Sequence, residues 1–405
     1  SELKGPNLTL GVATTALAEG MMLLGHGGGE QILLARAGGE IFAIGASCTH
    51  YHGPLAEGLL HDQSVRCPWH HACFDLRNGE ALRAPALDPV PCFQVEQRNN
   101  KIFVSGKKQP TPKRSTIVKM PSGPIVIIGG GAAGLAAAEM LRRRNFTGPI
   151  TILSSDDSPP VDRPNLSKDF LAGTASEDWL PLRPETFYAE ADIDLELETT
   201  VSKIDPRQKK VISNKGELSY ERLLLATGAE PVRLPIPGAD LAHVSVLRTL
   251  ADCRRIIALG QDAKQAVVVG ASFIGLEVAA SLRKRGITVH VVAPEKLPME
   301  RTLGPELGAF IKTLHQNNGV LFHLEDTVAT IEPGRVRLKS GQTVFADLVC
   351  VGVGVKPRIQ LAEQTELEVD RGILVNEYME TSIPDIFAAG DIARFPDRFG
   401  DKIRV

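Results

Sequence analysis

The sequence predicts a multidomain protein in which a small all-β domain precedes an α/β region built on two similar βαβ units. Residues 1–106 alternate short β-like runs with glycine and proline turns, which is typical of an all-β domain. The runs lie at 31–35, 40–44, 94–96 and 101–105. From residue 124 onward, apolar strands alternate with helices, the pattern of a parallel sheet covered on both faces.

Two loops of the all-β region carry metal-ligand residues, Cys48-Thr-His50 and Cys67-Pro-Trp-His70. A Rieske [2Fe–2S] cluster needs two thiolates for one iron and two imidazoles for the other. One Cys and one His from each loop supply this set. A zinc site with two Cys and two His is the alternative. Zinc fingers group like ligands together, however, so the spacing favours the Rieske cluster.

The first βαβ unit carries a glycine turn of the dinucleotide-binding kind, Gly129-x-Gly131-x-x-Gly134. A strand at 125–128 leads in, and a helix to about residue 144 and a strand at 150–153 follow. The first glycine allows the tight turn, the second lets the backbone approach phosphate, and the third lets the helix pack on the strand. The helix N-terminus then faces a pyrophosphate with free N–H groups and a positive dipole end.

The second unit repeats this pattern around Gly270-x-Ser272-x-x-Gly275, although Ser272 replaces the middle glycine and weakens the match. The surrounding elements are a strand at 266–269, a helix through residue 284 and a strand at 288–292. The chain is therefore expected to contain two Rossmann-like dinucleotide-binding domains.

Each unit should end its second strand with an acid that binds ribose hydroxyls. Neither has one directly after the strand, but Asp156 and Glu295 follow slightly later. Glu295 is the expected NADH ribose partner. No arginine lies at that position for a 2′-phosphate, whereas Lys296 leaves NADPH open, so the sequence favours NADH over NADPH.

Distant segments assign the first site to FAD. An apolar strand that starts at residue 223 ends in the small-residue turn Thr227-Gly228, beside a cofactor. A second strand, within 381–390, delivers Asp391 at its carboxyl end, where ligands of open α/β sheets bind.

Residues 124–405 resemble the pyridine-nucleotide-dependent flavoprotein reductases, in the branch of the ferredoxin reductases and apoptosis-inducing factor. The most branch-specific motifs are Asp-Arg-Pro-Asn-Leu-Ser-Lys at 162–168 and Phe-Ile-Gly-Leu-Glu at 273–277. With the Rieske region in front, the whole chain resembles the Rieske-containing apoptosis-inducing-factor-like proteins.

Together, the glycine turns and the resemblance imply a set of cofactor-binding residues. For FAD they are Gly129, Gly131, Ala133, Gly134, Ser155, Asp156, Arg163, Lys168, Val201, Thr227, Gly228, Arg248 and Asp391. For NAD(H) they are Gly270, Ile274, Gly275, Glu295 and Gly354. The resemblance also places Lys168 beside the flavin N5 edge, paired with Glu277 as the catalytic pair. A cation there stabilises reduced flavin, and the carboxylate keeps the lysine charged and oriented.

Composition restricts the partners and the compartment. Lys and Arg total 45 against 48 Asp and Glu, so the net charge of −3 gives no reason to expect nucleic acid or an anionic membrane surface. The longest apolar run, 125–138, is too short and too glycine-broken to span a membrane, and no signal-peptide pattern is visible. The four cysteines outside the cluster loops are expected to be free thiols, which predicts a cytoplasmic location.

The chain is therefore predicted to be an NAD(P)H-dependent flavoprotein oxidoreductase of the ferredoxin-reductase kind. Electrons from NADH are expected to pass through FAD to the Rieske [2Fe–2S] cluster and on to an unknown one-electron acceptor. A homodimer is one assembly that the sequence allows. No cysteine lies between Cys92 and Cys253, so thiol chemistry at the flavin is not expected. The alternative is an NADH-sensing, apoptosis-inducing-factor-like interaction protein with slow turnover.

The predicted domains follow from these motifs. Residues 1–106 are assigned to the Rieske domain and 107–123, rich in lysine and proline, to an extended linker. Residues 124–239 and 359–405 are assigned to the FAD-binding domain, and 240–358 to the NAD(H)-binding domain. Members of the resembled family continue with a C-terminal interface domain, so the sequence is expected to be either a fragment or a protein without that domain.

Overall fold

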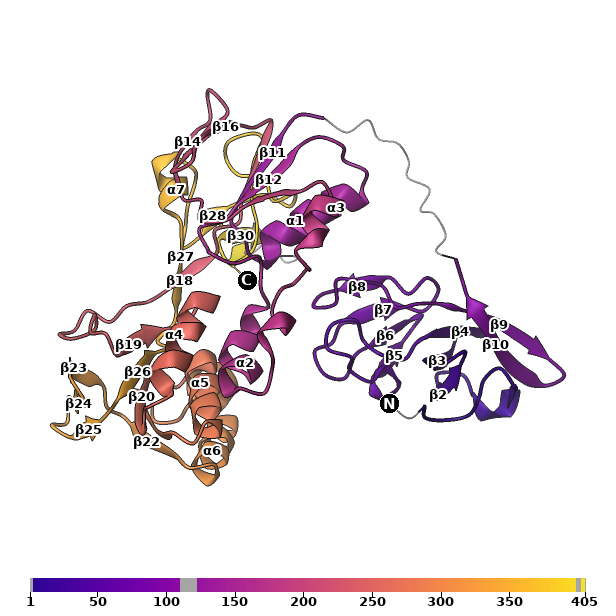
Figure 1. Ribbon diagram of the computed structural model, residues 1–405, viewed down its shortest axis with the longest axis horizontal. Coiled ribbons are helices and arrows are strands. Elements are labelled where there is room, and N and C mark those ends of the chain that lie inside the picture. Colours follow the sequence, from indigo (N-terminus) through magenta and orange to yellow (C-terminus); the bar gives the residue numbers. More distant parts are fainter. Residues whose placement is uncertain (1–2, 110–121, 398–401, 405) are drawn as a thin grey trace. The chain divides into compact units, whose positions relative to one another are not determined.

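The computed structural model describes residues 3–109, 122–397 and 402–404 (Figure 1). The chain divides into two compact units, Ser1–Thr116 and Ile117–Val405. Most of the predicted linker, at 110–121, lies outside the described residues, as do 398–401 and 405 of the predicted return segment.

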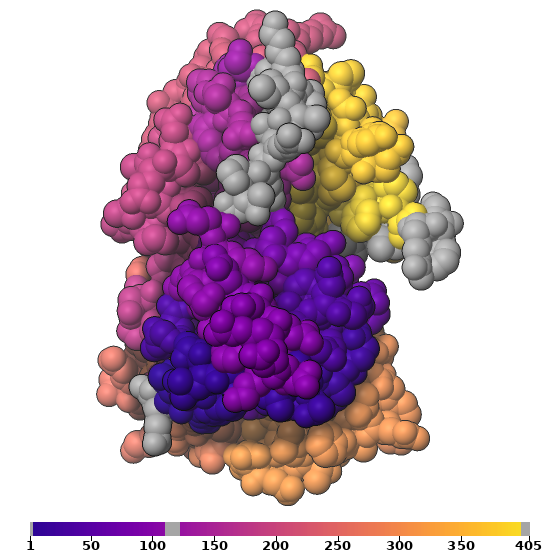
Figure 2. Space-filling view, turned by 90° about the vertical axis from the view of Figure 1, so that its right-hand side faces the viewer, coloured from indigo at the N-terminus to yellow at the C-terminus, as the bar shows by residue number. Residues whose placement is uncertain are grey.

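The N-terminal unit is all-β, as the sequence predicts, and Figure 2 shows it in indigo to purple as one compact body. Its antiparallel sheets have the strand orders β2-β3-β4, β1-β10-β9 and β5-β6-β7-β8. The strands are β1 Val12–Ala13, β2 Met22–Gly27, β3 Glu30–Ala37, β4 Glu40–Gly45, β5 Leu59–His61, β6 Ser64–Arg66, β7 Cys73–Asp75, β8 Ala81–Arg83, β9 Phe93–Arg98 and β10 Lys101–Lys107, with short 3₁₀ helices η1 Thr14–Ala16 and η2 Leu55–Glu57. All four predicted runs fall inside strands, in β3, β4, β9 and β10.

Two hairpins of this unit turn on glycine pairs. Gly28 and Gly29 have φ of 60° and 85°, and Gly38 and Gly39 have φ of 63° and 80°. Turns with positive φ at both central residues match the twist of the flanking strands, and glycine adopts them without steric cost. These turns set the register that buries Leu33 and Ile44 in the core behind the cysteine loops.

The C-terminal unit begins with a parallel sheet of strand order β13-β12-β11-β17-β29. Its elements are β11 Ile125–Ile128, α1 Ala132–Arg143, β12 Ile150–Leu153, α3 Thr186–Glu190, β13 Asp194–Glu196, β17 Arg222–Leu225 and β29 Ile386–Ala388. Side chains of β11 alternate between two cores: Ile127 packs with Leu135 of α1, and Val126 packs with Ile373 of the return segment. Both faces are therefore covered, and Figure 1 shows the yellow return segment beside β11 and β12.

A second parallel sheet has the order β19-β26-β20-β21-β22. Its elements are β19 Val244–Val246, α4 Leu250–Gly260, β20 Gln265–Val269, α5 Phe273–Lys284, β21 Thr288–Ala293, α6 Glu300–Asn317, β22 Val320–Leu324 and β26 Leu348–Val351. Val268 packs with Leu276 of α5, whereas Val267 on the opposite face packs with Val336. The two predicted Rossmann-like units are thus confirmed.

The remaining elements connect and cover these sheets. They are η3 Arg163–Ser167, α2 Asp169–Ala172, η4 Glu177–Trp179, the antiparallel sheet β14 Val201–Asp205, β15 Lys210–Ser213 and β16 Gly216–Ser219, the pair β18 Ala229–Pro231 and β27 Val355–Pro357, the sheet β23 Val328–Glu332, β24 Arg335–Leu338 and β25 Thr343–Phe345, and the return elements α7 Gln360–Gln364, β28 Ile373–Leu374, β30 Ala393–Pro396 and β31 Lys402–Arg404. Among the helices of the described residues, none combines the length and apolarity that crossing a bilayer requires.

Candidate iron–sulfur and dinucleotide sites

The two cysteine loops of the N-terminal unit have the same backbone geometry. In each loop the cysteine N–H donates to the carbonyl five residues later, and its carbonyl accepts from the N–H four residues later. The bonds are Cys48 N to Gly53 O at 2.9 Å, His52 N to Cys48 O at 2.9 Å, Cys67 N to Ala72 O at 2.8 Å and His71 N to Cys67 O at 3.1 Å. Two matching loops thus present one cysteine and one histidine each.

The loops bring the four predicted ligands together. Cys48 and Cys67 are 1% and 2% exposed, and their thiols interact directly. The rings of His50 and His70 lie edge to face with centroids 5.0 Å apart. Burial, together with the neighbouring Cys67 thiol, raises the pKa of Cys48 to about 11. Two buried thiols need a cationic partner to ionise, so this donor set fits iron bound by thiolates and imidazoles.

Gly53, in the first loop, lies directly against the residues of the second loop. A Cβ atom at this position would lie 2.6 Å from Cys67 Sγ and 3.2 Å from the Trp69 ring. Carbon atoms do not approach sulfur this closely without contact strain. The position therefore requires glycine because the ligand of the opposite loop occupies the place of a side chain.

In the first dinucleotide unit, the glycine turn has the predicted form. Gly129 has φ of 125°, and a Cβ there would lie 2.1 Å from the carbonyl oxygen of Ala226. Gly131 caps the N-terminus of α1. A Cβ on Gly134 would lie 2.2 Å from the Gly129 carbonyl oxygen, so the close approach of helix to strand predicted for the third glycine is present.

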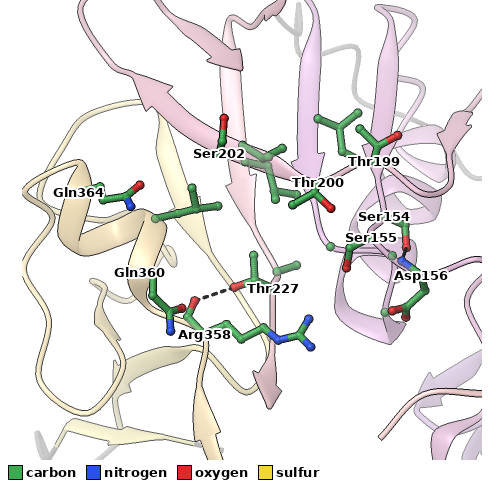
Figure 3. Close-up of a pocket in the computed structure, with 18 of the residues that line it drawn as sticks. Ser154, Ser155, Asp156, Thr199, Thr200, Ser202, Thr227, Arg358, Gln360 and Gln364 are labelled. Atoms are coloured by element: carbon green, nitrogen blue, oxygen red, sulfur yellow. Dashed lines mark hydrogen bonds between the residues drawn. The ribbon is translucent and has the colours of Figure 1, made fainter. Parts of the chain in front are cut away.

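This turn opens into a cavity of about 360 Å³ (Figure 3). Seven of the predicted FAD residues line it: Gly129, Gly131, Ser155, Asp156, Arg163, Val201 and Thr227. Figure 3 shows Asp156 and Thr227 beyond the carboxyl ends of two separate strands, β12 and β17, with Gln360 and Gln364 of α7 across the cavity from Asp156. Thr227 Oγ1 donates to the Arg358 carbonyl at 3.0 Å and ties the strand to the segment before α7.

Several lining residues were not anticipated from the sequence. They are Thr199, Thr200, Ser202, Arg358, Gln360, Leu361 and Gln364. They come from the turn before β14, from the start of β14 and from the region of α7, where no glycine turn or charged motif marks them. Hydroxyl and amide groups are the polar groups that orient a largely apolar ligand in such cavities.

Arginine side chains gather at the glycine turn. Arg163 lies 3.5 Å from Asp156, and Arg248 pairs with Asp391 at 2.6 Å. The Arg248 guanidinium would lie 3.3 Å from a Cβ on Gly228, and that of Arg163 would lie 3.9 Å away. Burial lowers the pKa of Arg163, and the nearby Arg248 lowers it further. Arg163 also lies beside Gly131, the N-cap residue of α1, where a Cβ would be 3.7 Å from its guanidinium. Two converging guanidiniums, one of them at a helix N-terminus, suit an anionic pyrophosphate.

The catalytic pair expected from the resemblance lies together. Lys168 Nζ is 3.6 Å from Glu277 Oε1, although the two residues belong to separate parts of the chain. Both are partly exposed, at 49% and 30% of their side chains. The remaining predicted FAD residues do not line the cavity; Ala133 and Gly134 lie in the first turn of α1.

The second glycine turn has the same geometry. Gly270 has φ of 109°, and a Cβ on Gly275 would lie 2.1 Å from the Gly270 carbonyl oxygen. Ser272 caps α5 and donates its hydroxyl to the Gly352 carbonyl at 3.2 Å. The serine that replaces the middle glycine therefore has a hydrogen-bond partner for its hydroxyl, at the carboxyl end of β26.

A cavity of about 260 Å³ adjoins this turn, and Glu295 lines it. The chain has no arginine next to Glu295, but the fold brings Arg301 of α6 to 3.8 Å from it. The sequence has no arginine at the position after the strand, but the start of α6 brings one near the predicted ribose acid. Of the other predicted residues, Gly270 lines the cavity, whereas Ile274, Gly275 and Gly354 do not. Gly354 instead accepts a hydrogen bond from Val232 N at 3.0 Å.

Comparisons with known proteins identify both units. Residues 10–94 match the Rieske [2Fe-2S] domain, and residues 123–402 match the pyridine nucleotide-disulphide oxidoreductases. The chain belongs to the pyridine nucleotide-disulphide oxidoreductases and carries a Rieske domain. The Rieske match decides between the cluster and the zinc alternative. The Rieske domain implies a [2Fe–2S] cluster, and the reductase family implies FAD and NAD(H).

The relatives confirm the resemblance. Human apoptosis-inducing factor 3 is 36% identical over 388 residues, which cover 91% of this chain and 64% of that protein. Rubredoxin-NAD(+) reductase of Pseudomonas putida is 37% identical over 288 residues, covering 69% of this chain and 75% of that protein. The crystal structure of the covalent putidaredoxin reductase–putidaredoxin complex aligns with a TM-score of 0.68 at 35% identity, covering 71% of this chain and 72% of that chain. The chain thus spans less than two thirds of the apoptosis-inducing factor 3 that it matches.

Proposed function

We propose that the chain is an NADH-dependent FAD oxidoreductase that passes electrons from reduced flavin to its own Rieske cluster and on to a one-electron acceptor. The observation that carries this proposal is one chain holding both a paired dinucleotide fold and a complete Rieske ligand set. Relatives named as reductases of rubredoxin and other electron carriers support it. When bound, FAD takes up two electrons and releases them singly, and a [2Fe–2S] cluster carries one.

The chain's own residues supply binding and orientation in this scheme. Arg163 and Arg248 would hold the FAD pyrophosphate at the start of α1, and Asp156 and Asp391 would accept hydrogen bonds from hydroxyls of the cofactor. Lys168 would place its ammonium at the flavin edge, where positive charge favours the reduced, anionic form. Glu277, 3.6 Å away, would orient that ammonium.

The geometry around Glu295 favours NADH as the reductant. A carboxylate at the ribose repels a 2′-phosphate and accepts hydrogen bonds from the two free hydroxyls. Arg301 Nε lies 3.8 Å from Glu295 Oε1, so the guanidinium balances part of the negative charge of this carboxylate. NADPH is the second substrate to compare, because Arg301 places a cation near Glu295 and Lys296 follows Glu295 in the sequence.

An anaerobic NADH titration with the Cys48→Ser variant tests the relay. Removal of one iron ligand should abolish the EPR signal of the cluster, whereas NADH should still bleach the flavin absorbance at the wild-type rate. Reduction of one-electron acceptors should fall at least about tenfold, because the cluster is the proposed exit for electrons. Unchanged rates with every acceptor would show that electrons leave the flavin directly.

A second candidate is an NADH-sensing interaction protein with slow turnover, in a monomer–dimer equilibrium. It is favoured by the relative that covers 91% of this chain, apoptosis-inducing factor 3. The lifetime of NADH-reduced flavin in air separates the two proposals. Reduced flavin that persists for many minutes, with a change in sedimentation on NADH addition, would favour the sensor.

A further inference from the structure

The segment that carries Lys168 is held by side chains from α4 and α5 of the second dinucleotide unit. Figure 1 shows α2, which follows Lys168, beside α5. Glu277 and Ser281 of α5 and Arg285, the C-cap residue of this helix, follow one another at four-residue spacing and so share one face. All three bond to the segment 167–171.

Ser281 holds the backbone on either side of the lysine. Its hydroxyl bonds to the carbonyl oxygen of Ser167 at 2.7 Å and of Lys168 at 3.1 Å. A serine inside a helix commonly returns its hydroxyl to the carbonyl four residues earlier. Ser281 instead reaches across to the facing segment, where it is 5% exposed. Cys253 of α4 and Arg285, the C-cap residue of α5, donate to the neighbouring carbonyls of Leu166 and Leu171.

Ser167 orients the partner of the lysine. Its hydroxyl donates to Glu277 Oε2 at 2.6 Å, which leaves Oε1 facing Lys168 Nζ at 3.6 Å. Ser167 is 5% exposed, so water competes little for this bond. Hydrogen bonds to a carboxylate are short and strong compared with neutral ones, and this one selects a single orientation of the carboxylate.

We propose that Ser167 and Ser281 are positioning residues that hold Glu277 and the Lys168 backbone on α5. The inference rests on the proposed function, since it assigns both hydroxyls to a reaction at the flavin edge. The N-terminus of the same helix forms the second glycine turn, where Ser272 caps α5. One helix therefore connects the predicted NAD(H) turn to the segment of Lys168. The two hydroxyls hold the lysine backbone and its carboxylate partner at a fixed place along this helix.

The test uses the full, FAD-loaded chain with Ser167→Ala and Ser281→Ala. Ser245→Ala is the matched control, because Ser245 is also buried, at 6% exposure, and its hydroxyl bonds to Arg255 instead. Two quantities are measured: the rate at which an amine-reactive reagent labels Lys168, read by peptide mass spectrometry, and the rate of flavin reduction at saturating NADH. Both test variants should raise the labelling rate several-fold. Ser167→Ala should slow flavin reduction about tenfold, the effect of one lost hydrogen bond to a charged group, and Ser281→Ala about fivefold, because its hydroxyl bonds to neutral carbonyls.

The NADH concentration that gives half-maximal reduction should stay unchanged, and Ser167→Thr, which keeps the hydroxyl, should restore both rates. Wild-type labelling and wild-type reduction in both alanine variants would overturn the proposal. If an alanine variant does not retain FAD, the cysteine variant at that position, a weaker donor, replaces it in both measurements. If NADH does not reduce the wild-type flavin, the proposed function fails, while the labelling rates still decide whether the hydroxyls position Lys168.

Discussion

At the scale of single residues, Gly53 carries the tightest steric demand of the cluster loops. A methyl group there would meet Cys67 Sγ at 2.6 Å, so Gly53→Ala must push the opposite loop away. We expect the variant to lose most of its [2Fe–2S] cluster, measured as iron per chain and as visible absorbance. Gly106→Ala is the control, since a Cβ on Gly106 of β10 has no atom within 4 Å. Equal iron content in the two variants would contradict this account.

Single residues also show where sequence reasoning reaches its limit. Asp156 and Glu295 could be found because a fixed strand–turn–helix order puts an acid a known distance behind each glycine turn. Arg301 and Arg358 could not, because they approach the sites through α6 and through the segment before α7. Their positions depend on how α6 and α7 are placed against the strand ends, for which no sequence pattern exists.

At the scale of elements, the N-terminus of α4 connects helix stability to the first cofactor site. Thr249 and Asp252 form a reciprocal cap, with Asp252 N donating to Thr249 Oγ1 at 3.1 Å and Thr249 N donating to Asp252 Oδ2 at 2.9 Å. Arg248 N donates to the same carboxylate at 3.0 Å. The cap therefore also fixes the backbone of the arginine that pairs with Asp391.

Thr249→Ala should destabilise the C-terminal unit by about 1 kcal/mol, the usual value of an N-cap side chain. The measurement is urea unfolding followed by release of FAD. Thr313→Ala serves as the control, because the Thr313 hydroxyl returns to the Ala309 carbonyl within exposed α6. A shift in the unfolding midpoint no larger than that of the control would show that the cap does not limit stability.

Elements were the most predictable part of this chain. The strands and helices around Gly129 and Gly270 lie where the sequence predicts them, since apolar alternation and glycine turns are local signals. The loops at Cys48 and Cys67 were recognisable from ligand spacing alone. The clamp formed by Ser281 was not, because a serine inside a helix carries no signal of the distant carbonyl that it binds.

At the scale of the whole molecule, each compact unit has cores of its own, so the two units should unfold as separate cooperative transitions. A ligand that binds one folded unit stabilises that unit alone, by about 2.7 kcal/mol at a hundredfold excess over its dissociation constant. Added FAD should therefore raise the transition of the C-terminal unit and leave that of the Rieske unit in place. Cys48→Ser should do the reverse and lower only the Rieske transition. Calorimetry of the full chain, with cluster and flavin absorbance recorded in parallel, measures both. A single transition in which cluster and flavin are lost together at every FAD concentration would show that the two units fold as one.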